Sequence, residues 1–283
     1  MDSTQTRRVR IGHSPDPDDA FMYYAIARGR IDTRGYDVQQ VLEDIESLNR
    51  RALQSELEVT ALSIHAYAHL ADRYALMPCG ASMGDGYGPI VVARQTLTRE
   101  DLAHVTIAIP GMLTSAYLAL RLFVGSEVSC VVVPFDRILD EVQSGRVDAG
   151  LVIHEGQLTY PTLGLHKIVD LGVWWGQTHD GLPLPLGGNA VRKDLGIETM
   201  RTLTRMYRES IAYALAHRGE ALDYAKDFGR GLDERLNDRF VGMYVNDLTL
   251  DYGERGRQAI RRFLDEGAGA GIVPRIAGLE FVS

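Results

Sequence analysis

Cysteine is scarce in this chain, and long apolar runs are missing from it. The only two cysteines, Cys79 and Cys130, lie far apart in apolar surroundings, which argues against a disulfide framework and against a cysteine metal site. No apolar stretch approaches the length of a membrane span, and the first eight residues, Met1 to Arg8, contain no apolar signal-peptide core. We therefore expect a cytoplasmic protein with reduced thiols and no membrane partner.

Positive charge is also in deficit. The chain has 30 lysines and arginines against 38 aspartates and glutamates, which gives a formal net charge of −8. This balance argues against nucleic acid as the main partner, although a local site in an acidic protein can still bind an anion.

At 283 residues the chain exceeds the size at which one hydrophobic core usually stops growing, so two lobes are expected.

A twelve-residue unit occurs twice in the chain. The segments 54–65 and 143–154 are identical at five positions, and both run through polar residues into an apolar stretch that ends in Ile-His. This pattern is typical of a helix end, a loop and a buried strand with a polar residue at its carboxyl end. Ligands of open α/β sheets bind at that edge, so the repeat predicts two similar lobes that each bring a histidine, His65 or His154, to a shared cleft. The alternative is a chance resemblance, since such units look alike in many α/β proteins.

The remaining patterns predict an α/β fold with two lobes and two crossings between them. Asp16 is expected to cap a helix that has Pro17 in its first turn, with Asp19 reaching back to the cap. The larger lobe is predicted to comprise residues 1–93 and 188–283, and the smaller lobe residues 94–187. Strands are expected at 9–13, 36–42, 59–64, 90–93, 105–109, 131–133 and 149–153. Helices are expected from 17, at 45–53, 116–124 and 138–143, from 199, and at 221–228, 236–244 and 257–264; the segment 182–188 is interpreted as a loop.

His154 is the first candidate for chemistry. It stands at the end of a predicted strand where the chain turns, and an imidazole there can transfer a proton near neutral pH. Glu155 could orient the ring, but adjacent strand residues point to opposite faces, which disfavours a direct pair. The alternative is a structural histidine that is hydrogen-bonded in a loop.

Thr114 and Ser115 start a predicted helix directly after a strand and a glycine turn. Free backbone N–H groups and hydroxyls in that position can hold an anion or a carbonyl, although a plain helix cap needs no ligand. The glycines at 84, 86 and 88 allow a close approach of backbone to a ligand, but they precede a strand and do not form a dinucleotide fingerprint.

A metal site is not expected. His13, Asp16, Asp18, Asp19 and His65 could be imagined as ligands, but helix capping already accounts for two of the aspartates and no dense His/Cys spacing is present. The chain also has no Gly-x-Ser-x-Gly elbow, which disfavours acyl-enzyme chemistry.

Several segments, taken in order, resemble the 1,4-dihydroxy-6-naphthoate synthase family of the futalosine pathway of menaquinone biosynthesis. They are Ser14-Pro15 with Pro17 and Asp19, 41–49, 66–74, 88–94, Ile109-Pro-Gly111 with 114–117, Ile153-His-Glu155 with 158–160, and 182–187. The resemblance covers about residues 10 to 255. It implies a two-lobed fold of the periplasmic-binding-protein type II, used as a cytoplasmic lyase without a metal or organic cofactor.

The resemblance also implies roles for single residues. The family's catalytic histidine corresponds to His154, and its threonine pair at the helix start corresponds to Thr114 and Ser115. Ser63 and Asn49 match positions that face the family's cleft. Asp19 and Gly88 lie in matching stretches and complete the expected substrate-binding set.

The chain departs from the family at several acidic positions. The family usually has cysteine where this chain has Asp16, and asparagine where it has Asp18; in addition, Ala20 replaces a threonine, His65 stands where a small residue is common, and Asp85 adds a carboxylate to the glycine loop. Negative charge near a cleft for an aromatic carboxylate is unfavourable, and it favours a paralogue with a changed ligand.

These observations lead to a functional hypothesis and two alternatives. His154 acts as the general base of a lyase that converts cyclic dehypoxanthine futalosine to 1,4-dihydroxy-6-naphthoate by C–C cleavage, while Thr114 and Ser115 hold the developing charge. The first alternative is a solute-binding protein or sensor without chemistry, and the second is a metal-dependent hydrolase built on His13 and the aspartates. The expected partner is a small-molecule substrate, with a second copy of the chain as a candidate.

Overall fold

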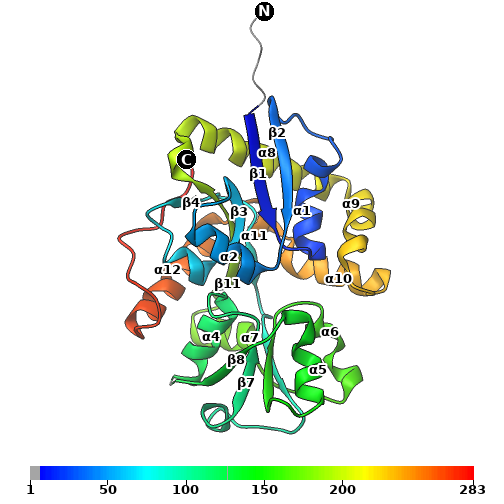
Figure 1. The fold of residues 1–283 in the computed structure, drawn as a ribbon, viewed down its shortest axis with the longest axis vertical. Coiled ribbons are helices and arrows are strands. Elements are labelled where there is room, and N and C mark those ends of the chain that lie inside the picture. Colours follow the sequence, from blue (N-terminus) through cyan, green and yellow to red (C-terminus); the bar gives the residue numbers. More distant parts are fainter. Residues whose placement is uncertain (1–6, 126) are drawn as a thin grey trace, which may run out of the picture.

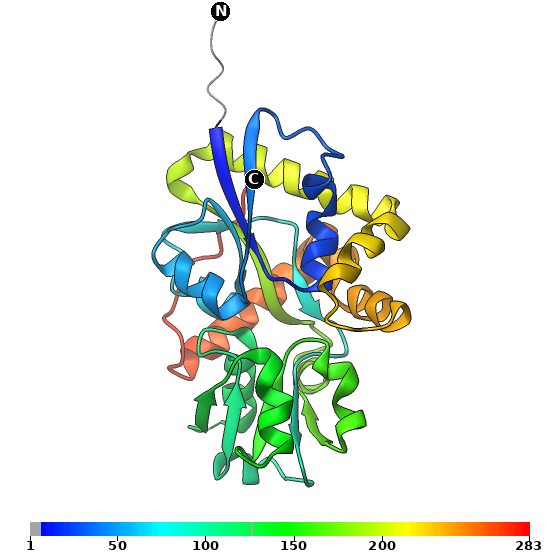
Figure 2. The ribbon, with the colours of Figure 1, turned by 45° about the vertical axis from the view of Figure 1, so that its right-hand side comes forward.

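Two lobes lie one above the other along the long axis of the molecule (Figures 1 and 2). The computed structural model describes residues 7–125 and 127–283. Each lobe contains one mixed sheet covered by helices. The first sheet has the strand order β2-β1-β3-β11-β4, with β5 paired to β11, and the second has the order β10-β6-β9-β7-β8. The expected α/β class with two lobes is confirmed.

The strands have the following bounds: β1 Arg7–His13, β2 Tyr36–Leu42, β3 Val59–Ser63, β4 Tyr74–Leu76, β5 Ser82–Gly84, β6 Ile90–Ala93, β7 Thr106–Ile109, β8 Ser129–Val132, β9 Ala149–Val152, β10 His166–Asp170 and β11 Leu184–Arg192. The α-helices are α1 Pro17–Ala27, α2 Ile45–Leu53, α3 Ile64–Tyr67, α4 Ser115–Val124, α5 Ile138–Gln143, α6 Gly156–Thr159, α7 Leu171–Thr178, α8 Ile197–Ala216, α9 Arg218–Ala225, α10 Glu234–Tyr244, α11 Asp247–Leu250 and α12 Gly253–Gly269. Short 3-10 helices occupy Asp101–Ala103, Phe135–Arg137, Tyr160–Leu163, Lys193–Leu195 and Lys226–Phe228. In the described part of the chain, no helix combines the length and the apolar character that a membrane crossing needs.

The two repeated units occupy equivalent places in the two sheets. The strand of the first unit, β3, is parallel to β1 and antiparallel to β11. The strand of the second unit, β9, is parallel to β7 and antiparallel to β6. In both lobes the antiparallel neighbour is a strand at which the chain enters from the other lobe. The equivalence of these pairings supports the duplication that the sequence predicts.

Helix α1 is buried along almost its whole length. The residues from Pro17 to Ile26 are all buried, and the helix packs against α8, α9 and α10. A helix that is covered on all sides carries apolar residues around its whole circumference, which is the pattern of Phe21, Met22 and Tyr23. This packing fixes the start of α1, where three aspartates face the second lobe.

The structure differs from the sequence predictions in two segments that border the cleft. The strand expected at 59–64 ends at Ser63, and Ile64 begins the short helix α3, so His65 lies on a helix and not at a strand end. The segment 182–188, interpreted as a loop from its two prolines, belongs largely to β11, which pairs with β5, β3 and β4. Pro185 is tolerated there because the register shifts between Pro185 and Gly187.

The division of the chain at 93/94 and 187/188 stays a prediction, and the sheets favour crossings a few residues earlier. Strand β6, Ile90–Ala93, pairs with β9 and β10 in the second sheet. Strand β11, which begins at Leu184, pairs in the first sheet. The large lobe accordingly denotes the elements around the first sheet, and the small lobe denotes β6 to α7.

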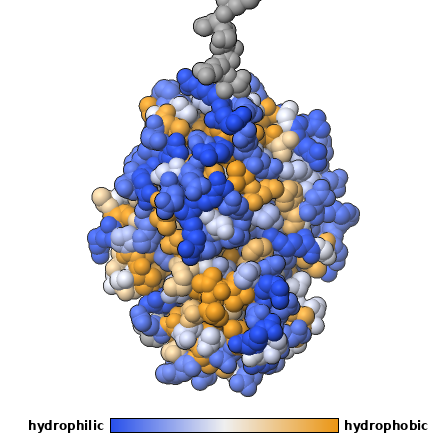
Figure 3. Space-filling view, in the orientation of Figure 1, coloured by the Kyte–Doolittle hydropathy of each residue, from blue (hydrophilic) through white to orange (hydrophobic). Residues whose placement is uncertain are grey.

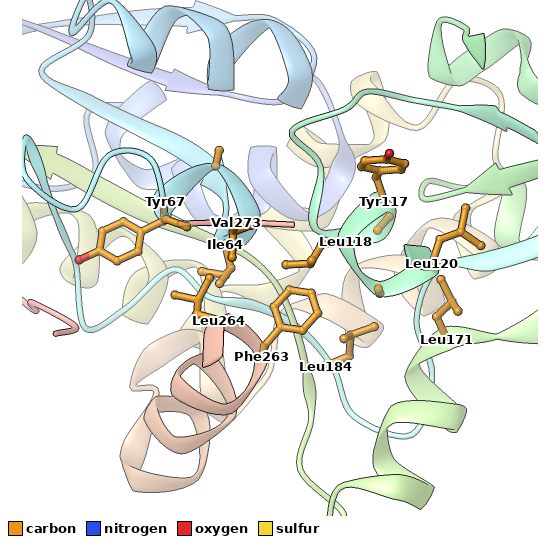
Figure 4. Close-up of a cluster of buried hydrophobic side chains, with 14 of the residues drawn as sticks. Ile64, Tyr67, Tyr117, Leu118, Leu120, Leu171, Leu184, Phe263, Leu264 and Val273 are labelled. Atoms are coloured by element: carbon orange, nitrogen blue, oxygen red, sulfur yellow. The ribbon is translucent and has the colours of Figure 1, made fainter. Parts of the chain in front are cut away.

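An apolar cluster joins the lobes on one side of the molecule. Figure 4 shows Leu118 of α4 from the small lobe beside Ile64 of α3 and Phe263 of α12 from the large lobe, with Tyr117 of α4 on the other side of Leu118. All four side chains are buried in one continuous core.

On the outer surface, Figure 3 shows apolar side chains on the front of the small lobe. The exposed large hydrophobic residues of the small lobe are Met112, Val131, Val132 and Val173.

Candidate active site

A cavity with an empty volume of about 700 Å³, counted with the solvent at its mouth, lies between the lobes. The small lobe contributes His154 and the start of α4 to its wall. The large lobe contributes the start of α1, the end of β3 and the middle of β11. The carboxyl ends of β3 and β9 therefore face each other across the cavity, as expected for ligand sites of open α/β sheets.

His154 lines this cavity and pairs with an aspartate of the other lobe. Its Nδ1 atom lies 3.0 Å from Oδ2 of Asp16. Its Nε2 atom is buried and has no hydrogen-bond partner among the described residues. The ring of Phe135 meets the imidazole edge-on, with 4.1 Å between the ring centroids. One ring nitrogen is thus held by a carboxylate, while the other makes no hydrogen bond with the described residues.

Asp16 does not act as the helix cap that the sequence predicts. It occupies the N-cap position of α1, but its side chain makes no capping hydrogen bond. One carboxylate oxygen accepts from the hydroxyl of Ser14 and faces His154, and the other accepts from both terminal nitrogens of Arg230 at 2.8 Å. Burial alone would raise the pKa of the Asp16 carboxyl, but His154 and Arg230 outweigh it and hold the pKa below its ordinary value.

Arg230 connects Asp16 to the small lobe. Its guanidinium also donates to Glu155 at 3.0 Å and lies 4.5 Å from the centroid of the Phe135 ring. The backbone of Arg230 has a positive φ of 44°, a conformation that costs free energy in a non-glycine residue. No sequence signal indicated this residue, because the Gly229-Arg230-Gly231 turn is 214 residues away from Asp16. As expected, Glu155 does not pair directly with His154.

The start of α4 presents backbone groups to the cavity, whereas the hydroxyls of Thr114 and Ser115 already accept hydrogen bonds from backbone N–H groups. Thr114 is the N-cap and accepts from the N–H of Tyr117 at 3.2 Å, as a plain cap does. The hydroxyl of Ser115 accepts from the N–H of His65 at 3.1 Å. Thr114, Ser115 and Ala116 all line the cavity, so the first backbone N–H groups of this ten-residue helix lie at its wall.

Of the remaining predicted binding residues, two line the cavity and two support its wall. Asp19 and Ser63 are lining residues. Asn49 is hydrogen-bonded to the lining residue Ser63, and Gly88 directly precedes the lining residue Pro89 in the chain. A Cβ atom on Gly88 would come within 2.7 Å of the backbone nitrogen of Gly172, so glycine is required there by a close backbone approach.

His65, the partner of His154 in the repeat, does not line the cavity. Its Nδ1 atom lies 3.1 Å from the carbonyl oxygen of Thr114, and burial lowers its pKa to about 4. The prediction that both repeated histidines face the cleft is therefore wrong for His65, because the chain turns into α3 after Ser63. His65 connects the large lobe to the start of α4 instead.

The acidic residues around the start of α1 and in the glycine loop add less negative charge to the cavity than their number suggests. Burial and the nearby Asp16 carboxylate raise the pKa of Asp19 to about 7, while burial and Asp19 raise the pKa of Asp18 well above its ordinary value. Arg230 compensates the charge of Asp16. Asp85 does not line the cavity and pairs with Arg255 at 2.7 Å. The raised pKa values of Asp18 and Asp19 and the ion pairs of Asp16 and Asp85 thus reduce the unfavourable negative charge expected at these positions.

Among the described residues, the side chains considered as metal ligands, His13, Asp16, Asp18, Asp19 and His65, do not come together as one ligand group. His13 is buried with its ring nitrogens near the carbonyl of Ser14 and the side chain of Gln40, and burial lowers its pKa to about 4. A different group, Asp16, His154 and Glu155, places one potential ligand atom each within 4.8 Å of one another. The Arg230 guanidinium already donates to both carboxylates of this group.

The fold and the cavity define a two-lobed α/β protein of the periplasmic-binding-protein type II architecture. An alkanesulfonate-binding protein of Xanthomonas axonopodis pv. citri has the same fold, with a TM-score of 0.70 and 12% identity over 95% of this chain and 94% of its own. A crystal structure of an Archaeoglobus fulgidus protein is far more similar, with a TM-score of 0.90 and 45% identity over 96% of this chain and 100% of its own.

The sequence comparisons place the chain in one family within this architecture. A family model described as menaquinone biosynthesis matches residues 9–268. A 1,4-dihydroxy-6-naphthoate synthase of Thermus thermophilus is 44% identical over 93% of this chain and 95% of its own length. The corresponding synthase of Streptomyces coelicolor is 37% identical over 95% of both chains. The chain belongs to this menaquinone-biosynthesis family.

Proposed function

We propose that the protein is a lyase of the 1,4-dihydroxy-6-naphthoate synthase type that acts on cyclic dehypoxanthine futalosine. The observation that carries the proposal is the unpartnered Nε2 atom of His154, buried at the wall of the interlobe cavity. Two synthases of this name align with nearly the whole chain. A base of this kind typically contributes about 10²–10⁴-fold to a rate when it is correctly placed.

The cavity offers complementary walls for such a substrate. The backbone N–H groups at the start of α4 favour a carboxylate or a developing oxyanion, because the helix dipole places partial positive charge there. Across the cavity, Ser63 and the carboxyls of Asp18 and Asp19, whose pKa values are raised, are suited to hydroxyl and carbonyl groups. Apolar side chains, including Ile45, Leu186 and Phe240, line the space between these walls and suit a ring system.

The proposed step begins with proton transfer to His154. Nε2 accepts a proton from a carbon next to a carbonyl, and the released electron pair is delocalised into an enolate whose oxygen is stabilised at the start of α4. The enolate electrons then form a C=C bond as the adjacent C–C bond breaks. The electron pair of that C–C bond leaves with the departing fragment, which takes up the proton from His154. The enzyme returns to its starting protonation state.

The direct test is incubation of the purified protein with cyclic dehypoxanthine futalosine, followed by detection of 1,4-dihydroxy-6-naphthoate. We expect product from the natural sequence and none above background from His154→Ala, while a thermal shift with the substrate persists in the variant. His217→Ala is a matched control, because His217 lies at the end of α8 and does not line the cavity. Near-normal turnover by His154→Ala would refute the role of this histidine.

The same assay decides between the lyase and the two alternatives. A substrate-induced thermal shift without product would favour a binding protein or a paralogue with a different ligand. Loss of turnover on chelation, restored by added metal, would favour a metal-dependent enzyme. The cytoplasmic location and the homodimer stay predictions that fractionation and light scattering would test.

A further inference from the structure

We propose that Asp16 and Arg230 of the large lobe form a clamp with His154 and Glu155 of the small lobe, and that Asp16 positions His154 only when the lobes are closed. The inference deepens the proposed function, since it names a positioning residue and a closing contact for the same base. The term clamp denotes the four residues Asp16, Arg230, Glu155 and His154.

The clamp joins residues from both lobes. Asp16 precedes α1, and Arg230 lies between α9 and α10, so both belong to the large lobe. His154 and Glu155 follow β9 in the small lobe. The pairs that cross the gap are His154 with Asp16 at 3.0 Å and Arg230 with Glu155 at 3.0 Å. Opening of the cleft at this point would break both contacts together.

The two sides of the cleft are held in different ways. On the side of α4 and α12, the lobes share the apolar cluster around Leu118 and Phe263 (Figures 1 and 4), in addition to the hydrogen bond from His65 to Ser115. On the side of α6 and α10, they meet through the clamp and through a hydrogen bond of 3.0 Å from Gln157 to the hydroxyl of Tyr244. Separating apolar surfaces exposes them to water, whereas polar groups exchange their partners for water at little net cost. The clamp side is therefore the side that opens.

The contact with Asp16 defines which nitrogen of His154 can act as a base. An ionised carboxylate accepts hydrogen bonds and cannot donate them, so the proton of the neutral ring must lie on Nδ1 and the lone pair on Nε2. Without Asp16 the ring is free to adopt the other tautomer, which leaves no acceptor on the unpartnered nitrogen. The same logic underlies the aspartate of serine-protease triads, where replacement by asparagine keeps the geometry but selects the wrong tautomer.

Arg230 stabilises the ionised form of Asp16, which the contact with His154 requires. The Asp16 side chain is only 6% exposed, and a buried carboxylate needs a compensating charge. Arg230 supplies that charge and also lies over Phe135, whose ring touches the imidazole of His154. Arg230 thus acts through Asp16 and Phe135 rather than on the substrate.

The first experiment replaces Asp16 by asparagine in the full-length protein. We expect kcat to fall by about 100-fold or more, with KM changed by less than about 3-fold, since tautomer selection affects chemistry rather than binding. Long-range proton–nitrogen spectra of ¹⁵N-histidine-labelled protein should show His154 protonated on Nδ1 in the natural sequence and on Nε2 in Asp16→Asn. Asp37→Asn, at an exposed ion pair with Arg8, is the matched control and should leave kcat and the spectrum unchanged.

The second experiment tests the closing contact without touching Asp16. Arg230→Gln, Glu155→Gln and the double variant should all have lower kcat, with the double variant no worse than Arg230→Gln alone. Small-angle scattering with bound substrate should give a larger radius of gyration for Arg230→Gln than for the natural sequence. Arg218→Gln, which removes an exposed ion pair with Asp238 within the large lobe, controls for charge.

The outcomes separate this inference from the proposed function. Normal kcat and an Nδ1-protonated His154 in a folded Asp16→Asn variant would overturn the positioning role, even if His154→Ala is inactive. Strictly additive effects of Arg230→Gln and Glu155→Gln, with an unchanged radius of gyration, would overturn the clamp. Product formation by His154→Ala would instead refute the proposed function itself.

Discussion

Two hydrogen bonds join the side chain of Asn49 to Ser63, one to its hydroxyl and one from its backbone N–H. Asn49 Nδ2 donates to the hydroxyl of Ser63 at 3.0 Å, and the backbone N–H of Ser63 donates to Asn49 Oδ1 at 2.9 Å. Asn49 also donates to the carbonyl of Leu113 in the small lobe at 3.4 Å. The wall of the cavity at the end of β3 is therefore held in place by a buried amide that does not itself line the cavity.

Replacement of Asn49 by alanine should destabilise the protein and weaken substrate binding. The change leaves the buried N–H of Ser63 without its partner, which typically costs about 1–3 kcal/mol in the free energy of unfolding. We expect a lower midpoint in urea and a raised KM with a smaller change in kcat. Gln39→Ala, at an exposed position of β2, should leave both quantities unchanged. A normal urea midpoint for Asn49→Ala would contradict the supporting role.

Replacement of Gly88 by alanine should be costly although this residue does not line the cavity. The new Cβ would meet the backbone nitrogen of Gly172 at 2.7 Å, and backbone atoms cannot move aside without shifting β6 or α7. Overpacking of this kind typically costs about 1–3 kcal/mol, and we expect a lower Tm by calorimetry.

The matched control for this prediction is Gly219→Ala. A Cβ on Gly219, in the first turn of α9, meets nothing within 4 Å. Alanine favours a helix over glycine by roughly 0.5–1 kcal/mol in helix interiors, so Tm should stay level or rise. Equal effects of the two substitutions would contradict the steric explanation.

Asp19 should make the folded state less stable as the pH rises from about 4 to 7. Burial and the Asp16 carboxylate raise its pKa from the ordinary 3.8 to about 7 in the folded protein. The folded state therefore binds more protons than the unfolded state between these values, and the free energy of unfolding falls as the pH increases through this window. Asp18, whose pKa is also raised, contributes in the same direction.

Urea titrations of the natural sequence and of Asp19→Asn at several pH values would measure this effect. Asparagine keeps an oxygen that can accept the N–H of Ser14, which Asp19 accepts at 2.9 Å, but it does not titrate. We expect the decline in stability between pH 4 and 7 to be shallower in the variant. Parallel curves for the two proteins would show that Asp19 is ionised throughout.

Residues close in the sequence explain most of the successful predictions. The strand at 36–42 and the helices at 45–53 and 138–143 have the predicted bounds, because alternation, periodicity and capping residues act over a few positions. The repeat placed His154 after β9, and the structure brings it to the cavity wall. Pro185 and the turn after Ser63 were misinterpreted, since partner strands far along the chain decide whether an apolar segment with proline becomes a strand.

The sequence by itself determined the two-lobed α/β architecture, the position of His154 and the helix start at Thr114, since each depends on local patterns and on the repeat. The tertiary structure alone decided that Asp16 faces an imidazole instead of capping its helix, that Arg230 pairs with Asp16, and that the pKa values of Asp18 and Asp19 are raised. The physical reason is that burial and charge pairing depend on which distant segments meet. Segments 214 residues apart carry no local signal of their contact.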